Sequence, residues 1–278
     1  MLLVLCAITD TDALWLVDRI RKAGIEVTVV TGELLAFARR RSHRLGCEGV
    51  VTSIELGNGT TITDANLTGV LNRLDGPPAA AWGFAAPAER DYAMAELHAF
   101  TLSWLSGLRC PVRNRPTASS LAGPAPHPWH AATAARRAGL AVPPLRLDTS
   151  MATGEGLVRN SYRAAAAAAG AGSRPVSLVC LDGEPVTRFR LPAALPDRIR
   201  LFARLIDADT DLIGLDFFVA PQGPGRADTW WYAGVTSLAS LPAGGIPLVR
   251  RIILLLAPDR VTGLGRVTGL DLDLAVAP

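Results

Sequence analysis

The sequence has little lysine, little cysteine and no long apolar run, and each scarcity narrows the possible kinds of protein. Lys22 is its only lysine, although lysine and arginine together number 28, so arginine supplies nearly all of the positive charge. The four cysteines, Cys6, Cys47, Cys110 and Cys180, lie far apart and form no Cys-x-x-Cys pair. This spacing argues against a zinc site or a disulfide framework. We expect buried free thiols in a reducing compartment.

Membrane and targeting segments are also lacking. The best apolar candidate, residues 252–257, is far shorter than the roughly 18 residues of a membrane-spanning helix. The run at residues 1–8 lacks a basic region and is soon followed by Asp10 and Asp12, so we expect a buried strand and not a signal peptide. A net charge of +3, with 19% charged residues, creates no electrostatic field strong enough to attract nucleic acid or anionic membranes. The sequence predicts a cytoplasmic globular protein that binds neither nucleic acid nor a membrane.

Hydrophobic periodicity in the first half predicts alternating strands and helices. Residues 2–8 and 25–30 are expected as buried strands, and residues 12–23 and 33–41 as the helices that follow them. Such a β-α-β-α start indicates a parallel sheet with right-handed crossovers. The other elements expected in this half are a hairpin of residues 50–56 and 60–62 around Gly57-Asn58-Gly59, a strand at 70–74, an apolar helix at 88–105 and a short strand at 110–112.

In the second half we expect helices and antiparallel hairpins. The alanine-rich stretch 163–169 is either a helix or an irregular surface segment. The other elements expected are one short and one longer helix within 117–139, a hairpin of strands 176–181 and 186–189, a helix at 196–208, strands at 212–219 and 229–236, and a helix at 247–256. Because Trp230 and Trp231 fall in a predicted edge strand, we also predict self-association or a protein partner.

Polar side chains follow two of the predicted strands. Asn72 and Arg73 close one of them, and Asn114 and Arg115 follow the other. In open α/β sheets, ligands gather at such strand ends. Together with Glu96 of the intervening helix, these residues either line a ligand groove or form a buried network that joins two halves of the protein, since buried polar groups must be paired in either case.

Residues 72–144 resemble the ATP-grasp superfamily, in its branch of ribosomal-protein and peptide-modifying ligases. There, a small N-terminal α/β domain leads into the ATP-binding lobes. The matching residues are Asn72-Arg73, Glu96, Cys110-Pro111-Val112, Asn114-Arg115-Pro116, Leu121-Ala122-Gly123, Trp129, Ala138-Gly139-Leu140 and Val142-Pro143. The resemblance covers about the first half of the chain and thins beyond residue 145.

This resemblance implies chemistry that the second half of the chain supports poorly. ATP-grasp ligases activate a carboxylate as an acyl phosphate and pass it to an amine, with cations on the polyphosphate and oxygen ligands on Mg²⁺. The family's phosphate-binding lysines are absent, because no lysine follows Lys22. The arginines in the corresponding region are Arg159, Arg163, Arg174, Arg188 and Arg190. The planar head of arginine does not reproduce the placement of an ammonium group.

The metal ligands that the resemblance implies are also incomplete. The family's closing strand ends in Glu-x-Asn, and Gly234 and Thr236 stand at the corresponding positions. Asp216 is retained in a Gly-x-Asp element, but one carboxylate does not make a two-ion Mg–ATP site. Residues 169–173 lack the lysine and the preceding strand of a phosphate-binding loop. We therefore expect no catalytic residue and no metal ligand.

Two smaller motifs have structural interpretations. His127 and His130 have no cysteine or further histidine at ligand spacing, so we interpret this segment as a helix start and not as half a metal site. Ser119 and Ser120 precede His127 without a Gly-x-Ser-x-Gly elbow, which argues against a nucleophile and base.

The sequence as a whole predicts an α/β protein with three parts. These are an N-terminal parallel-sheet domain at 1–115, a reduced ATP-grasp-like α+β portion at 116–260 and a tail at 261–278. We expect a catalytically degenerate protein, a pseudoenzyme, that binds or scaffolds a ligase of a biosynthetic pathway or its peptide or small-molecule substrate, with no cofactor.

Two alternatives stay open. In the first, the protein is an active ATP-dependent carboxylate–amine ligase in which arginines such as Arg188 bind phosphate and Asp216 holds the metal, with Mg–ATP as cofactor. In the second, it binds a small molecule or peptide near Asn72 and Asn114 without nucleotide.

Overall fold

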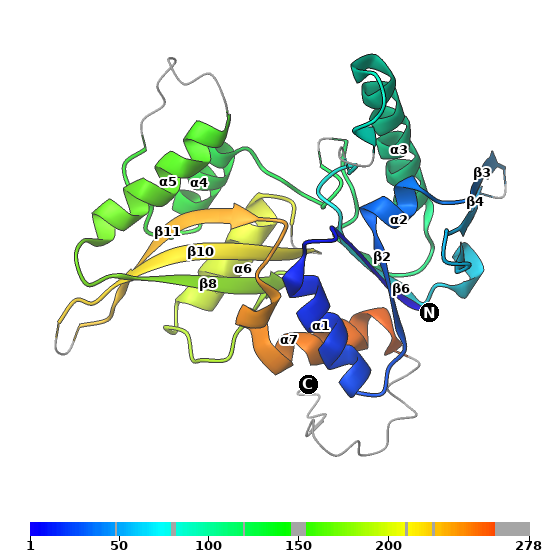
Figure 1. Ribbon diagram of the computed structural model, residues 1–278. Helices are drawn as coiled ribbons and strands as arrows, with labels where there is room; N and C mark the ends of the chain where they lie inside the picture. Colours follow the sequence, from blue (N-terminus) through cyan, green and yellow to red (C-terminus); the bar gives the residue numbers. More distant parts are fainter. Residues whose placement is uncertain are drawn as a thin grey trace. The chain divides into compact units, whose positions relative to one another are not determined.

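The computed structural model describes residues 1–47, 49–78, 82–118, 120–145, 154–208, 211–223 and 226–258, without the side chains of residues 154–160. The chain forms two compact units, which Figure 1 shows. The first comprises Met1–Val112 and the segment that begins at Gly245, and the second comprises Arg113–Gly244. The domain boundaries expected at residues 115 and 260 stay a prediction.

The first unit is built on a parallel sheet. Its elements are, in chain order, β1 (Leu2–Cys6), α1 (Thr11–Lys22), β2 (Val27–Thr31), α2 (Gly32–Ala36), β3 (Arg40–Gly46), β4 (Gly49–Glu55), β5 (Thr61–Thr63), the 3₁₀ turn η1 (Asp64–Asn66), β6 (Gly69–Arg73), α3 (Pro87–Gly107) and β7 (Val112–Arg113). The strand order is β2-β1-β6-β7, and β1 runs parallel to both β2 and β6. All five residues of β1 are buried, as expected for a parallel strand covered on both faces. The predicted β-α-β-α start is confirmed.

One face of this sheet carries the larger part of an apolar core. Leu3 and Leu5 of β1 pack with Leu35 of α2 and with Trp104 of α3, and Ile54 of β4 belongs to the same cluster. The alternate residues of β1 point to the other face, where α1 packs. The sheet is thus the middle layer of an α/β sandwich.

The segment after α2 departs from the sequence prediction. A helix was expected over residues 33–41, but α2 ends at Ala36 and β3 begins at Arg40. The guanidinium of Arg41 donates to the carbonyl oxygens of Leu35 and Ala36, which closes the helix end. Across the hairpin, β3 pairs with all of β4, from Arg40 opposite Glu55 to Gly46 opposite Gly49. Most of these pairings join residues further apart in the sequence than the four residues of a helical hydrogen bond. The periodicity of a short segment therefore did not reveal them.

The second unit is built on an antiparallel sheet of order β11-β10-β8-β9. Its elements are α4 (Pro128–Arg137), α5 (Gly154–Ala169), β8 (Arg174–Leu181), β9 (Glu184–Val186), α6 (Leu195–Leu205), β10 (Leu212–Ala220) and β11 (Thr229–Thr236). On one face, Leu178, Leu215 and Phe217 pack against Phe202 of α6. On the other face, α5 lies over the β10/β11 end of the sheet, where Ala165 contacts the cluster around Phe218. Figure 1 shows α5 and α6 on opposite sides of these strands.

Several predictions for this unit are confirmed and one is wrong. The alanine-rich stretch is helical, and the hairpin β8/β9 turns at Asp182 and Gly183, both with positive φ (52° and 74°), as a two-residue turn requires. The short helix expected after residue 117 is wrong: the described residues before α4 form turns and a bridge between Thr117 and Ser120, and only the longer helix is present. In the first unit, Cys47 is exposed in the β3/β4 turn, contrary to the expectation of buried thiols.

The helix α7 (Leu241–Leu256) returns the chain to the first unit. It contains a break at Gly245, where φ is 60° and ψ is −154°. Its buried apolar side chains are those of Leu248, Val249, Ile252, Ile253 and Leu256, and its last turn meets β6 where Gly69 begins that strand. Within the described ranges, no helix has both the length and the hydropathy of a membrane span.

Candidate functional site

The first polar cluster lies at the carboxyl end of β6, as the sequence predicted. Arg73 forms a buried ion pair with Asp10, with Nε 2.7 Å from Oδ2 and Nη2 3.2 Å from Oδ1. Asp10 also caps α1 by accepting from the N–H of Ala13. Asn72 is fully buried, and its Oδ1 accepts from the N–H of Leu74 at 3.1 Å. The cluster therefore ties the strand end to the start of α1.

The thiol beside this cluster is not activated. Burial, together with a smaller contribution from the nearby Asp10 carboxylate, raises the pKa of Cys6 to about 11. A thiol with so high a pKa is protonated at neutral pH and is a poor nucleophile. Cys6 is therefore part of the core and not a candidate catalytic residue.

The second polar cluster lies in the second unit and centres on Asn114. This residue is fully buried with φ at 60°, and its backbone N–H donates to Oδ1 of Asp211 at 2.9 Å. Its side-chain Oδ1 accepts from the N–H of Leu212 at 2.8 Å, and its Nδ2 donates to the carbonyl oxygen of Ser237 at 2.9 Å. Asn114 thus joins the start of β10 to the segment that leaves β11.

Asp211 completes this cluster. Burial raises the pKa of its carboxyl group, while hydrogen bonds from the backbone N–H groups of Asn114 and Arg115 lower it. The chain therefore positions Asn114 and Arg115 around one buried carboxylate. Of the predicted ligand-binding residues, Glu96 on α3 and Arg188 just beyond β9 are exposed and belong to neither cluster.

The third candidate region is the polar face of β8, β10 and β11. Asp216 of β10 lies opposite Ser177 of β8 and Gly234 of β11, and Ser177 Oγ donates to its Oδ1 at 2.6 Å. These residues form one cross-strand row. In the next such row, two residues away along each strand, Thr236 of β11 lies opposite Gly214 of β10. A Cβ at Gly234 would meet no atom within 4 Å, so the position where the resemblance expects a glutamate is open. Thus Asp216 is the single carboxylate in these two rows.

A small cavity lies beside that open position. Its volume is about 220 Å³, and β11, α4, α5 and the loop before α4 contribute its walls. The lining includes Pro126, Ala131, Ser161, Gly234 and Thr236. The cavity is mostly apolar with a few hydroxyl groups, which suits a small uncharged group better than a polyphosphate.

The described residues around Asp216 do not fit Mg–ATP in the manner that the ATP-grasp resemblance requires. Magnesium prefers several hard oxygen ligands, whereas Asp216 faces a glycine and a serine. No group of three histidine, cysteine, aspartate or glutamate residues gathers at a possible metal site anywhere in the described ranges. The one lysine, Lys22, lies on α1 of the first unit, where its Nζ is 2.8 Å from Asp18.

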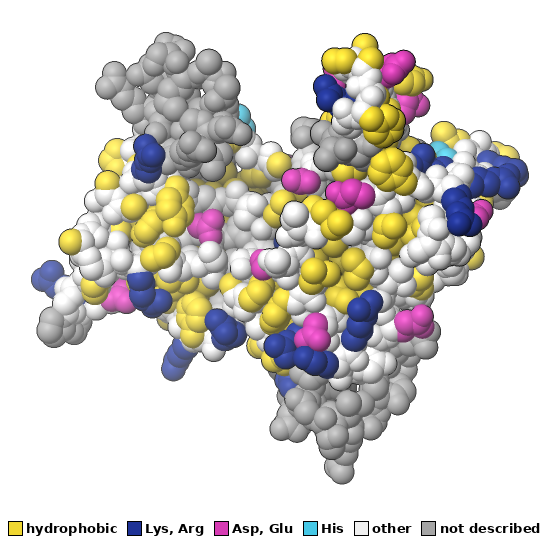
Figure 2. All heavy atoms as spheres, in the orientation of Figure 1, with side chains coloured by type: hydrophobic (Ala, Val, Ile, Leu, Met, Phe, Trp, Pro, Cys, Tyr) yellow, Lys and Arg dark blue, Asp and Glu magenta, His cyan; other side chains and the backbone are white. Residues whose placement is uncertain are grey.

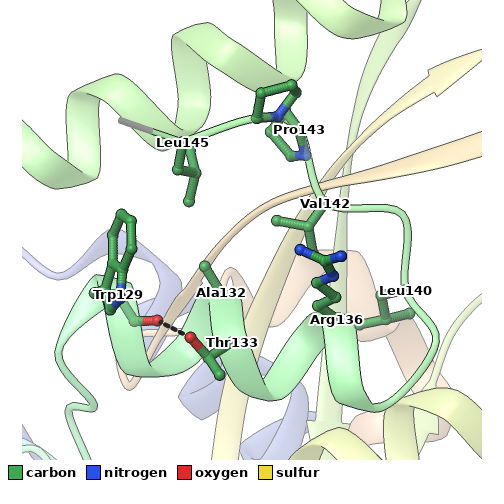
Figure 3. Close-up of a pocket in the computed structure, with 9 residues that line it drawn as sticks. Trp129, Ala132, Thr133, Arg136, Leu140, Val142, Pro143 and Leu145 are labelled. Carbon is green, nitrogen blue, oxygen red and sulfur yellow. Dashed lines mark hydrogen bonds between the residues drawn. The ribbon is translucent and has the colours of Figure 1, made fainter. Parts of the chain in front are cut away.

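A groove that sequence reasoning did not assign lies along α4. Its volume is about 610 Å³. One wall is formed by α4, which presents Trp129, Thr133 and Arg136 at helical spacing, and the other by the extended residues Val142 and Leu145 with the prolines between them (Figure 3). Pro143-Pro144 keeps this second wall extended. The available sequence signal was a tryptophan followed at i+4 and i+7 by polar residues in an alanine-rich segment of helical pattern.

The groove is chemically mixed. Trp129 and Arg136 are exposed, and Figure 3 shows both side chains in the wall formed by α4. Trp129 supplies an aromatic surface, Val142 and Leu145 supply apolar contacts, and Arg136 supplies a cation. Such a combination suits a short peptide with apolar side chains and a carboxylate.

No protein family model and no curated protein sequence matches the chain. Solved structures match it in fold. Macrocyclase MdnC bound with precursor peptide MdnA from Microcystis aeruginosa MRC has a TM-score of 0.59 at 10% identity, covering 92% of this chain and 99% of that chain. A Chryseobacterium gregarium RiPP-associated ATP-grasp ligase in complex with ADP and a leader and core peptide has a TM-score of 0.61 at 10% identity, covering 93% and 96%.

ATP-grasp ligase PsnB, complexed with a phosphomimetic variant of its minimal precursor, Mg and ADP, has a TM-score of 0.60 at 14% identity, covering 92% of this chain and 98% of that chain. At these identities the likeness concerns the fold. The chain has an ATP-grasp-like α/β fold, as the sequence resemblance predicted.

Proposed function

We propose that this ATP-grasp-like protein lacks ligase catalysis and acts as a peptide-binding or scaffolding partner of a biosynthetic ligase. The observation that carries the proposal is the row formed by Ser177, Asp216 and Gly234, in which one carboxylate faces an open glycine position. A ligase site needs several oxygen ligands to hold the metal of Mg–ATP. The fold would then retain the binding role without the reaction.

The peptide part of the proposal has two supports. The structures with similar folds include complexes with precursor, leader and core peptides. The groove along α4 offers Trp129, Arg136 and Leu145 to a peptide side chain and a carboxylate. A ligand near Asn72 and Asn114 has less support, because both amides are fully buried and hydrogen-bonded within the protein.

Calorimetry with Mg–ATP tests the absence of nucleotide chemistry. We expect no binding at micromolar concentration, because the second unit has no lysine and Asp216 is the single carboxylate in its cross-strand row. Arg188→Ala provides the comparison and Arg190→Ala the matched control, since both side chains are exposed beyond β9. Micromolar binding that is lost in Arg188→Ala and kept in Arg190→Ala would contradict the proposal and favour the active-ligase alternative.

Native mass spectrometry of the purified chain tests the peptide role. We expect a co-purified peptide that is lost in the double variant Trp129→Ala/Arg136→Ala and retained in Arg137→Ala, an exposed neighbour on the same helix outside the groove. A peptide retained in the double variant would show that the α4 groove is not its site. A wild-type protein that carries no peptide, even after co-expression with an ATP-grasp ligase and its precursor, would refute the peptide role.

A further inference from the structure

The first unit contains a second, smaller sheet with an open edge. Its order is β3-β4-β5, and within the described part of the chain no strand pairs with the outer side of β3. Five of the seven residues of β3 are exposed. An edge strand of this kind presents unpaired backbone N–H and C=O groups and can accept a further strand.

The same edge concentrates positive charge. Arg39, Arg40, Arg41 and Arg44 fall within six residues, and Figure 2 shows Lys/Arg side chains gathered at the β3/β4 end of the molecule. Arg41 is engaged with the end of α2, and Arg39 lies 4.0 Å from Glu55. Arg40 and Arg44 form no ion pair with any described residue.

The two faces of β3 differ in their environment. His43 bonds to Ser103 of α3 through Nε2 at 2.8 Å, so the face that carries it packs on the helix. Because side chains alternate along a strand, Arg40, Ser42 and Arg44 lie on the opposite face. That face is hollowed by about 300 Å³, with Arg40 and Ser42 of β3, Ser53 and Glu55 of β4 and Thr61 of β5 as its lining.

We propose that β3 captures an extended acidic peptide segment of another protein, which adds to the sheet as a fourth strand. Backbone hydrogen bonds to the outer side of β3 would hold the segment, and carboxylates at every second position would pair with Arg40 and Arg44. Glu55 and the hydroxyl groups of the hollow would favour spaced carboxylates over a dense polyanion. A second copy of β3 is a poor partner, because its arginines would lie opposite these and like charges across strands are destabilising.

This proposal does not depend on the proposed function. The β3 edge belongs to the first unit, whereas the α4 groove and the Asp216 row belong to the second. Failure of one proposal therefore leaves the other standing.

Fluorescence anisotropy on the full chain tests the proposal, with a labelled probe of sequence Glu-Val-Glu-Thr-Glu-Val, acetylated and amidated. We expect saturable binding that weakens with added salt, and at least about fivefold weaker binding to Arg40→Gln/Arg44→Gln. The matched control is Arg198→Gln/Arg204→Gln, which removes two exposed arginines from α6 of the second unit and is expected to leave the affinity unchanged.

Two further measurements separate strand addition from simple charge attraction. A probe with two consecutive N-methylated central amides should lose binding, because both of its edges are blocked. Hydrogen exchange of residues 40–46 should slow when the unmodified probe binds. Three results would each overturn the acidic-strand assignment. The first is a methylated probe that binds as tightly as the unmodified probe, and the second is an equal loss of affinity in the Arg40/Arg44 and Arg198/Arg204 variants. The third is a single-stranded dT12 oligonucleotide that binds as tightly as the peptide probe and depends equally on Arg40 and Arg44.

Discussion

At the scale of the residue, Asn114 shows how one polar side chain can hold a fold together. It is one of three described non-glycine residues with positive φ, and its amide bonds to two backbone groups on separate segments of the second unit. Asparagine tolerates this backbone conformation better than most residues. A position that looked like a ligand contact in the sequence therefore has a structural task, which its side-chain bonds to Leu212 and Ser237 perform.

Replacing Asn114 by alanine is expected to lower the free energy of unfolding by about 2–4 kcal/mol, since the N–H of Leu212 and the carbonyl of Ser237 lose their partners in a buried setting. Urea denaturation of the full chain measures this change. Asn58→Ala, in the exposed β4/β5 turn, is the matched control and should change the value by less than about 1 kcal/mol. Equal effects in the two variants would contradict the structural role of Asn114.

At the scale of the element, α7 and β6 meet where neither can accommodate extra atoms. A Cβ built on Gly69 would lie 2.8 Å from both Cα and Cβ of Leu256. Real side chains do not approach so closely, so the last turn of α7 must move if this position carries a side chain. Glycine at the start of β6 thus allows the last turn of α7 to pack directly on that strand.

Gly69→Ala is expected to destabilise the protein by about 1–3 kcal/mol through displacement of α7. Gly76→Ala is the control, because a Cβ there would meet nothing within 4 Å and its backbone is not in the left-handed region. Thermal unfolding followed by circular dichroism compares the two variants with the wild-type chain. A Gly69→Ala midpoint as high as that of the control would show that the contact is easily relieved.

At the scale of the whole molecule, the two units differ in their continuity along the chain. The second unit is one uninterrupted segment, Arg113–Gly244, with its own apolar core around Phe202 and Phe217. The first unit needs two segments, because Gly69 of β6 is in contact with Leu256 of the returning helix. Local continuity favours independent folding.

We expect the fragment of residues 113–244 to fold alone and to unfold cooperatively in urea. The fragment of residues 1–112 should be unstable, because the buried side chains of α7 would no longer cover its sheet. Dispersion of amide proton shifts and the steepness of the urea transition distinguish these outcomes. A well-dispersed spectrum for residues 1–112 would contradict the requirement for α7.

Much of the fold followed from periodicity. Unbroken apolar runs marked buried strands, as in β1, and the Asp182-Gly183 pair marked a hairpin turn. The helical start of α2 was also correct, but its end was not, because the pairing of β3 with β4 joins residues up to fifteen positions apart. Pairing of that kind depends on packing against α3, which periodicity within the segment does not report.

By itself, the sequence determined the α/β class, the parallel start, the scarcity of lysine and the glycine and threonine at the expected metal positions, because these depend on composition and short-range pattern. The tertiary structure alone decided that Arg73 and Asn114 are bonded within the protein, that a groove runs along α4, and that β3 is an arginine-rich open edge. Each of these depends on which distant segments meet, and burial and pairing are properties of the assembled chain.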